Sequence, residues 1–355
     1  MLMIAGFVCV GVVLVVSGGN PSDLIQTQLA RLRLMSQQEA LDRPIGTDAT
    51  PIRFEVAPGD TPRIIAQKLV SAGLIADVEL FMDYVRAEGL DVQLEAGTFF
   101  LYRTESTRQI ANALTDSASS QFTFSILEGE RLEEIAFNRI DGNRFFGFTG
   151  ADFFALVGPG APQDPAFAQA VGLPAGASLE GFLFPDTYQL PAAITPLLLR
   201  DILTDQFLQR IGTEIPQAAQ QQGLTIYQVV TLASIIQREA VRVDEMPAIA
   251  SVYRNRLAIG MKLDADPTVQ YGIGFRNGSW WPQITVQDYQ GVLSPYNTYR
   301  STGLPPGPIA SPGMSAIRAA LFPTQSDYYY FRARCDGSGY HTFARTFEEH
   351  LANAC

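Results

Sequence analysis

The chain has 355 residues, of which 47% are hydrophobic and 17% charged, and its formal net charge at pH 7 is −11. A chain of this length and composition can bury a sizeable core and is expected to hold two or more domains, which excludes a largely disordered protein. The acidic balance lacks the basic surface that binding to DNA or RNA requires, so we expect no nucleic-acid partner.

The N-terminal segment is the first distinct element. Residues 1–16 are all apolar or glycine, and no charged residue precedes Asp23. A helix of roughly 20 residues spans a bilayer, so residues 1–19 are predicted to be a transmembrane anchor and residues 20–50 a polar tether that is helical or irregular. A cleaved signal peptide would carry a basic segment and a small-residue cleavage site, and the sequence has neither. Because the basic flank that orients such helices is also missing, we expect the true start to lie upstream of Met1.

Residues 51–118 are predicted to form a small α+β module. A strand over 52–57 and a glycine turn lead into one helix, and a second helix is expected over 78–88. The run Val56-Ala57-Pro58-Gly59-Asp60-Thr61, followed by Ile64-Ile65-Ala66, resembles a LysM domain. The resemblance implies binding of glycans that contain N-acetylglucosamine; a packing module without sugar binding is the alternative. The helix boundaries rest on Thr61 and Pro62 at the start of the first helix, Gly73 at its end, and Asp77 and Gly89 around the second. The apolar face of the first helix is assigned to Ile64, Ile65, Leu69 and Val70.

The same strand–turn–helix pattern recurs seventy residues later in the sequence. Two copies are too few for a solenoid, so the second copy is predicted to lead into a C-terminal domain over 119–355. Residues 141–178 are expected to be a partly helical insertion. The chain as a whole is assigned to the α+β class, and its C-terminal domain is expected to be mainly helical with short strands. Helices of that domain are predicted over 197–211, 225–243, 246–259, 315–320 and 347–352.

The helix predicted over 225–243 carries an acid, Glu239, on its apolar side. At about 100° per residue, Glu239 falls within the arc of Val229, Leu232, Ala233, Ile235, Ile236 and Ala240. The opposite side is assigned to Thr231, Ser234 and Arg238. Burial beside aliphatic neighbours raises the pKa of a carboxyl group, which is the condition for a general acid near neutral pH. An ion pair at the helix end is the alternative, with Arg242, Arg254 or Arg256.

Two other acids flank an aromatic run. Glu180 and Asp186 lie on either side of Phe182 and Phe184, and aromatic segments with acids suit carbohydrate, which stacks on rings and hydrogen-bonds at its edges. From the residues alone we favour a core strand, in which the two phenylalanines point inward and the acids stand at the ends.

Polar turns follow in the last hundred residues. Asp264 and Asp266 precede Pro267 and are interpreted as turn residues. The loop over 294–299 combines two tyrosines with asparagine and threonine, which suits a sugar-binding surface, although a plain cluster of surface turns would have the same composition.

Cysteine and histidine limit the chemistry. With three cysteines and two histidines in the chain, the sequence offers no cluster of four zinc ligands and no G-x-S-x-G nucleophile motif, so we expect neither a metal site nor a Ser-His-Asp triad. Cys335 and Cys355 could form a disulfide in an oxidising compartment, and two free thiols fit the sequence equally well.

Seven motifs, in order along the chain, together resemble the MltG/YceG-like endolytic murein transglycosylases, and the resemblance runs from about Phe54 to His350. The motifs are Leu179 to Tyr188 (LEGFLFPDTY), Leu232 to Ile236 with Glu239, Asn255-Arg256-Leu257 with Gly260-Met261, Asp266-Pro267-Thr268-Val269, Tyr296-Asn297-Thr298-Tyr299, Gly303 to Gly307 and His341-Thr342-Phe343. The resemblance implies an inner-membrane anchor, a LysM-like subdomain, a periplasmic catalytic domain and a catalytic glutamate at Glu239. The sequence departs from the family at Phe182-Leu183-Phe184, where members often carry tryptophan.

The activity that the resemblance implies is lytic cleavage of the β-1,4 bond between N-acetylmuramic acid and N-acetylglucosamine in nascent peptidoglycan, which leaves 1,6-anhydromuramyl ends and stops strand elongation. No metal or cofactor is expected, and membrane-bound peptidoglycan synthases are the expected partners. The alternatives are a two-carboxylate hydrolase, which would use Glu239 with Glu180 or Asp186, and a non-catalytic wall-binding scaffold. Besides the catalytic Glu239, substrate contacts are assigned to Glu180, Asp186, Asn255, Asp266, Thr268, Tyr296, Asn297, Thr298 and Tyr299.

Overall fold

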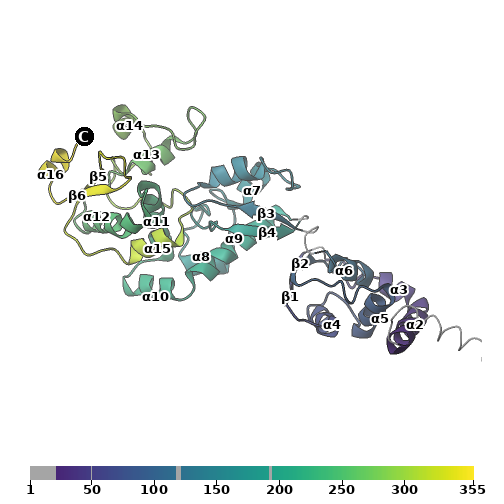
Figure 1. The fold of residues 1–355 in the computed structure, drawn as a ribbon. Helices are drawn as coiled ribbons and strands as arrows, with labels where there is room; N and C mark the ends of the chain where they lie inside the picture. The colour runs from purple at the N-terminus through teal and green to yellow at the C-terminus, as the bar shows by residue number, and fades with distance from the viewer. Residues whose placement is uncertain (1–20, 49, 117–120, 192–193) are drawn as a thin grey trace, which may run out of the picture. The chain divides into compact units, whose positions relative to one another are not determined.

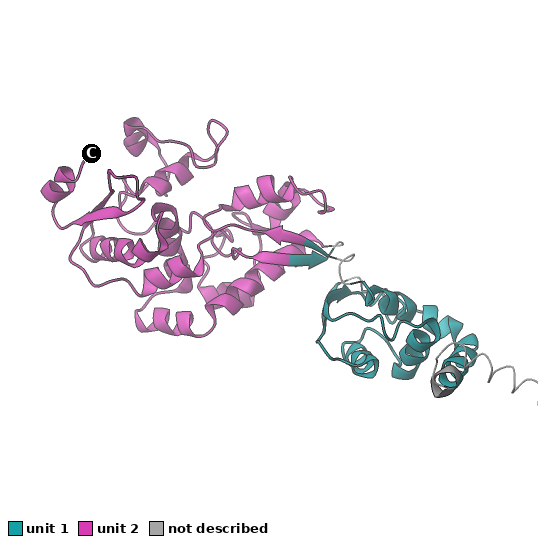
Figure 2. Cartoon of the chain, in the orientation of Figure 1, with its two compact units in different colours: residues 1–122, 189–192 teal, residues 123–188, 193–355 magenta. Residues whose placement is uncertain are grey.

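The computed structural model describes residues 21–355 except 49, 117–120 and 192–193, with side chains from residue 25 onward. The anchor predicted over 1–19 lies outside the described residues, and no helix within them is long and apolar enough to cross a membrane. The chain divides into two compact units (Figure 2): unit 1 ends at residue 122 and includes 189–192, and unit 2 consists of 123–188 and 193–355. Both contain mostly helices with short two-stranded sheets, which confirms the α+β class (Figure 1).

Unit 1 is built on an antiparallel pair of strands, β1 (Ile52–Val56) and β2 (Gly97–Leu101), with Phe54 opposite Phe99. The two predicted helices are present. The Thr61 side chain caps α4 (Pro62–Ser71), and α5 (Val78–Glu88) runs from its Asp77 cap to Gly89, which adopts the left-handed conformation that favours glycine. A third helix, α6 (Thr107–Ala113), begins at a capping box formed by Ser106 and Gln109.

Two details of unit 1 differ from expectation. The buried face of α4 consists of Ile65, Ala66 and Leu69, whereas Ile64 and Val70 are exposed. The segment predicted as a tether forms α2 (Pro21–Met35) and α3 (Gln38–Asp42), whose residues Ala30, Leu34 and Leu41 are buried in the core of unit 1. In α2, Ala30 and Leu34 lie one helical turn apart on the face that packs mainly against α5. Of the other large apolar residues of this helix, Ile25, Leu29, Leu32 and Met35 are exposed. The likeness of residues 51–118 to a LysM domain stays a prediction.

Unit 2 carries the second copy of the strand–turn–helix pattern. Strand β3 (Gln121–Ser125) pairs with β4 (Thr187–Pro191), and the helix of the copy, η1 (Glu134–Ile140), is a π-helix with Ile135 buried. The remaining elements are α7 (Gly150–Val157), α8 (Pro165–Val171), α9 (Pro196–Ile211), α10 (Glu214–Gln221), α11 (Ile226–Glu239), η2 (Val243–Glu245), α12 (Met246–Ala258), α13 (Asp266–Ile273), α14 (Val286–Gly291), α15 (Met314–Leu321), β5 (Tyr330–Ala333), β6 (His341–Ala344) and α16 (Phe347–Ala352).

Helix α11 lies in the centre of unit 2 and contacts α12, α13 and α15 (Figure 1). The prediction that Thr231, Ser234 and Arg238 form a polar side of α11 is wrong in part, because Thr231 and Ser234 are buried as well. Their hydroxyl groups avoid the cost of burial by local hydrogen bonds: Thr231 donates to the Tyr227 carbonyl, and Ser234 donates to the Thr231 carbonyl and accepts from the Ile309 amide. The helix ends at Glu239 rather than at 243, since the next residue is extended.

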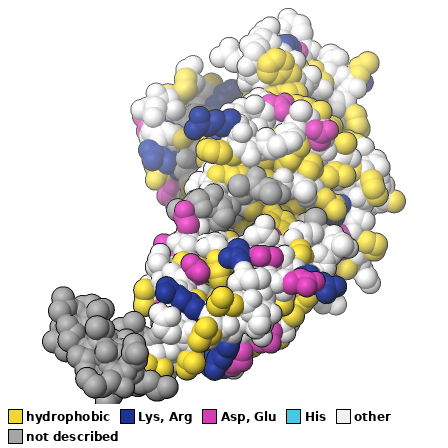
Figure 3. Space-filling model, turned by 90° about the vertical axis from the view of Figure 1, so that its right-hand side faces the viewer, with side chains coloured by type: hydrophobic (Ala, Val, Ile, Leu, Met, Phe, Trp, Pro, Cys, Tyr) yellow, Lys and Arg dark blue, Asp and Glu magenta, His cyan; other side chains and the backbone are white. Residues whose placement is uncertain are grey.

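Other segments of unit 2 also depart from the predicted elements. Residues 179–186 are turns rather than a strand, although Phe182 and Phe184 do point inward. Asp266 does not sit in a simple turn but begins α13, because a proline in the first turn of a helix loses no hydrogen bond. Helices α10 and α14 lie where the sequence predicts none; both are short and mostly polar, and α10 buries Ile215, Ala218 and Ala219 on one face. On the face shown in Figure 3, acidic and basic side chains are interspersed.

Candidate active site

The end of α11 places Glu239 in a pocket of about 480 Å³. The side chain is half-buried, so protein surrounds it on most sides while part of it remains open to the pocket. The lining comes from the end of α11, from α12, from the segment that leads into α13, and from the β5–β6 and α16 region. The other lining residues are Tyr253, Arg256, Leu263, Asp264, Asp266, Tyr289, Tyr299, Tyr330, Phe331, Arg332, Ala333, His341, Phe347 and His350.

A tyrosine from the neighbouring helix holds the carboxyl group of Glu239. The Tyr253 hydroxyl donates to Glu239 Oε1 at 2.7 Å, and the Tyr253 ring is buried edge-on against Phe331. The expected alternative, an arginine ion pair, is not what the structure shows. Arg242 instead donates to the Ser338 carbonyl, and Arg256 donates to the carbonyl oxygens of Tyr329 and Leu263. Glu239 is therefore fixed in orientation without a strong charge partner.

The environment of Glu239 favours its protonated form. Burial raises the pKa of Glu239 to about 7, against the effect of the hydrogen bond from Tyr253, which stabilises the charged form. The negative charge of Asp266 contributes to this rise, and the positive charges of Arg256 and Arg238 oppose it. Near neutral pH the carboxyl group is thus close to half protonated, so it can both give and accept a proton.

A second tyrosine–carboxylate pair lines the same pocket. The Tyr299 hydroxyl donates to Asp266 Oδ1 at 2.6 Å, and the Tyr299 ring stacks on Tyr289 with 4.4 Å between centroids. Asp266 and Tyr299 are the two predicted substrate-binding residues that the structure brings into the pocket of Glu239. The aromatic faces and hydroxyl groups of Tyr289 and Tyr299 suit a sugar ring.

Four predicted substrate contacts instead hold the walls of the pocket. Asn255 donates to the carbonyl oxygens of Ser326 and Tyr328, at 2.9 Å each. Thr268 and Thr298 are buried and hydrogen-bonded to each other, and the buried Asn297 amide donates to the carbonyl oxygens of Tyr289 and Val292. Thr268, Asn297 and Thr298, which are buried and hydrogen-bonded, position the loop that carries Tyr299, whereas Asn255 holds the segment before β5. None of the four lines the pocket.

The remaining three predicted contacts do not line this pocket. Glu180 is buried, accepts from the Leu132 amide and from the Tyr271 hydroxyl, and has its pKa raised to about 8, mainly by burial. Asp186 forms an ion pair with Arg210, which together with other hydrogen bonds holds its pKa below the usual value despite burial. The ring of Tyr296 lies 4.7 Å from that of Tyr271. Segment 179–186 therefore serves the interior of unit 2 in the structure.

The pocket also contains residues that the sequence did not reveal. Tyr253 looks like a core aromatic residue of a helix, and Arg332 and His350 lie about a hundred residues beyond Glu239, so no local pattern links them to it. His341 belongs to a recognised motif, and its Nδ1 lies 2.9 Å from a carboxylate oxygen of the buried Glu245. The sequence does hold one signal for Tyr253. It lies two turns into α12, the helix that follows Glu239 and packs against α11.

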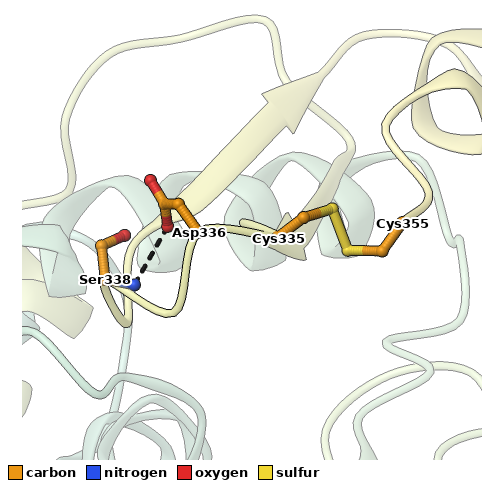
Figure 4. Close-up of a disulfide and its surroundings, with 4 residues drawn as sticks. All are labelled: Cys335, Asp336, Ser338 and Cys355. Carbon is orange, nitrogen blue, oxygen red and sulfur yellow. Dashed lines mark hydrogen bonds between the residues drawn. A yellow bond between two sulfur atoms is a disulfide. The ribbon is translucent and has the colours of Figure 1, made fainter.

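A disulfide closes the C-terminal wall of the pocket. Cys335 and Cys355 are joined, and next to them the Asp336 carboxylate accepts from the Ser338 amide (Figure 4). The bond links the residue two positions after β5 to the residue three positions after α16, so it ties together the two elements that carry Arg332 and His350. Of the two interpretations of the sequence, the structure has the disulfide.

Known proteins resemble this chain over most of its length. Residues 54–355 match the model of the YceG-like family. The endolytic murein transglycosylase of Bacillus subtilis (strain 168) is 30% identical over 334 residues, which cover 88% of this chain and 86% of the relative. That of Streptococcus pneumoniae is 28% identical over 347 residues, covering 89% of this chain and 60% of the relative. The structure also resembles the crystal structure of a yceG-like protein from Listeria monocytogenes, with a TM-score of 0.56 and 29% sequence identity. The superposition covers 86% of this chain and 99% of that one.

Proposed function

The chain belongs to the YceG-like family, and from this we infer that it is an endolytic murein transglycosylase. The substrate is the glycan strand of nascent peptidoglycan, and cleavage terminates strand elongation. We further propose that Glu239 is the catalytic acid and base. The observation that supports this role is a half-buried carboxyl group with a pKa near 7, held by one tyrosine at the bottom of a pocket lined with aromatic rings.

The reaction requires one proton donor that becomes a proton acceptor. Protonated Glu239 gives its proton to the oxygen that links muramic acid C1 to N-acetylglucosamine, and the C1–O bond breaks through an oxocarbenium-like state. The carboxylate then takes the proton of the muramyl C6 hydroxyl group as its oxygen attacks C1. One C–O bond breaks and one forms, Glu239 ends protonated, and no water is consumed.

A single carboxylate suffices because the nucleophile belongs to the substrate. Ordinary glycosidases need a second carboxylate to activate water or to attack C1, whereas an internal hydroxyl group is already held near the reacting carbon. Glu180 and Asp186, the two acids considered for a hydrolytic mechanism, are engaged away from the pocket. Asp266 is the acid that a hydrolase at this site would use, and its Oδ1 accepts from Tyr299.

Product mass distinguishes the reactions. Digestion of purified peptidoglycan, followed by mass spectrometry, is expected to give fragments with 1,6-anhydromuramyl ends, which are one water lighter than hydrolytic ends. Hydrolytic ends would contradict the proposal and indicate a two-carboxylate hydrolase. Strands that bind to the protein but stay intact would indicate a wall-binding scaffold.

We also propose the organisation that the sequence predicts. Residues 1–19 anchor the chain in the inner membrane by a single span, residues 51–118 bind glycan in the manner of a LysM domain, and residues 119–355 act on the periplasmic side. Membrane-bound peptidoglycan synthases are the proposed partners. The apolar run over 1–16 supports the anchor, and the murein-cleaving relatives support catalysis outside the cytoplasm.

Replacing Tyr253 by phenylalanine is expected to shift the pH dependence of cleavage to higher pH. The lost hydrogen bond stabilises the charged form of Glu239, so without it the pKa of Glu239 rises. Since the protonated form starts the reaction, the alkaline limb of kcat/KM moves upward, and kcat falls roughly tenfold because the carboxyl group is less well oriented. Initial rates between pH 5 and 9 measure both effects; a limb that stays in place or moves to lower pH would contradict the assignment.

A further inference from the structure

The β5 wall of the pocket carries a cation that has no partner. Arg332 lines the pocket that holds Glu239, and its Nη1 is buried without a hydrogen bond. Within the described residues, the structure records no ion pair for its guanidinium group. A buried donor without a partner costs free energy, and such donors are rare in folded proteins. Arg332 is therefore a candidate for binding a group that arrives with the substrate.

The other arginine of the pocket differs from Arg332. Arg256 donates to three backbone carbonyl groups, lies 3.8 Å from Asp264, and so is occupied in holding the fold of the wall. The acids of the pocket, Glu239, Asp264 and Asp266, come from the segment around α11 and α13 rather than from β5. The pocket thus has acids contributed by one part of unit 2 and an available cation contributed by another.

A histidine on the same wall also lacks a partner. His350 lines the pocket from α16, and its buried Nδ1 makes no hydrogen bond. Its ring packs against Tyr330 and Phe347, which fixes its plane. Arg332 and His350 both line this pocket. Burial lowers the pKa of His350, and the positive charges of Arg332 and Arg256 act in the same direction. The disulfide holds the strand of one and the helix of the other together.

On the basis of the proposed function, we propose that Arg332, with His350 beside it, is an anion subsite that binds a carboxylate of the peptide stem on the muramyl residue being cut. The sugar rings of the strand are neutral, and the carboxylates of the stems are its negative charges. Arginine presents a planar pair of N–H groups that match a carboxylate, and such charge-assisted hydrogen bonds are the stronger ones. A carboxylate at Arg332 would place the stem on the β5 wall and leave the sugar ring against Tyr299 and Glu239.

The test compares strands with free stem carboxylates and the same strands after methyl esterification. For the wild-type chain, esterification is expected to raise KM about tenfold with kcat nearly unchanged, the effect of losing one charge-assisted hydrogen bond. Arg332→Met, which keeps an unbranched side chain in place of the arginine stem and removes the guanidinium group with its charge, is expected to show the higher KM on both substrates. The matched control is Arg144→Met, which removes the same charge from an exposed site of unit 2 and is expected to behave as wild type.

The proposal is overturned if esterification leaves the KM of the wild-type chain unchanged, or if Arg332→Met and wild type respond equally to it. The first comparison needs no substitution, so it holds even if Arg332→Met folds poorly. Failure of the proposed function is a separate result, since a wild-type chain that releases no anhydromuramyl ends from either substrate would refute the activity and not the subsite alone.

Discussion

Replacing Glu239 by glutamine is expected to lower kcat/KM for strand cleavage by roughly 10³- to 10⁴-fold. General acid–base catalysis contributes about this much, and here one carboxyl group performs both proton transfers. Glutamine keeps the shape of the protonated acid and can still accept from Tyr253, so binding of glycan strands is expected to remain within about twofold. Rates of release of anhydromuramyl ends and titration calorimetry with a muramyl oligosaccharide measure the two quantities.

A matched control for this experiment is Glu214→Gln. Glu214 is an exposed partner of Arg318 on unit 2, and an exposed ion pair contributes little to stability. We expect its activity to equal that of the wild type. Substantial cleavage by the Glu239 variant, or an equal loss in both variants, would remove Glu239 from the mechanism.

Glu239→Gln is also expected to stabilise the folded protein in alkaline solution. The pKa of Glu239 lies near 7 in the folded chain against an ordinary value of 4.5, so the folded state holds the proton more tightly than the unfolded state. The wild-type chain is therefore most stable, with respect to this group, below pH 4.5 and loses that stability as pH rises through about 7. The shift corresponds to about 3 kcal/mol, an upper bound because the side chain is partly open to solvent.

Urea unfolding at pH 5 and pH 8.5 tests this expectation. Glutamine cannot ionise, so the variant should exceed the wild type by little at pH 5 and by up to about 3 kcal/mol at pH 8.5. A catalytic acid that lowers stability is an ordinary consequence of placing a titratable group in an apolar site. A difference that is the same at both pH values would mean that the proton on Glu239 is not coupled to folding.

Features set by neighbouring residues were predictable from the sequence. The caps of α4 and α5 follow from Thr61, Asp77 and Gly89, whose chemistry acts within one turn of the chain. Helical phase placed Glu239 on the apolar side of α11, and the structure gives it the raised pKa that this position implies. This feature was predictable because helical phase alone determines which residues share a face with Glu239, and a carboxyl group among aliphatic side chains has its pKa raised.

Features set by distant residues were not predictable. Nothing near Asn297 or Thr298 shows that their side chains are used within the wall, because a polar loop looks exposed until its hydrogen-bond partners are known. Thr231 and Ser234 appeared to mark a solvent-facing side for the same reason. Arg332 and His350 reach the pocket because β5 packs against α12, which lies far away in the sequence, and because α16 packs on β5 and β6.

The proposed mechanism requires that the carboxyl group of Glu239 hold a proton near neutral pH. The most direct measurement is the titration of its side-chain carboxyl carbon by ¹³C NMR, with the resonance assigned by its absence from the Glu239→Gln spectrum. We expect a midpoint near pH 7. A midpoint near 4.5, the ordinary value for glutamate, would contradict the account, because an ionised Glu239 could not deliver the first proton.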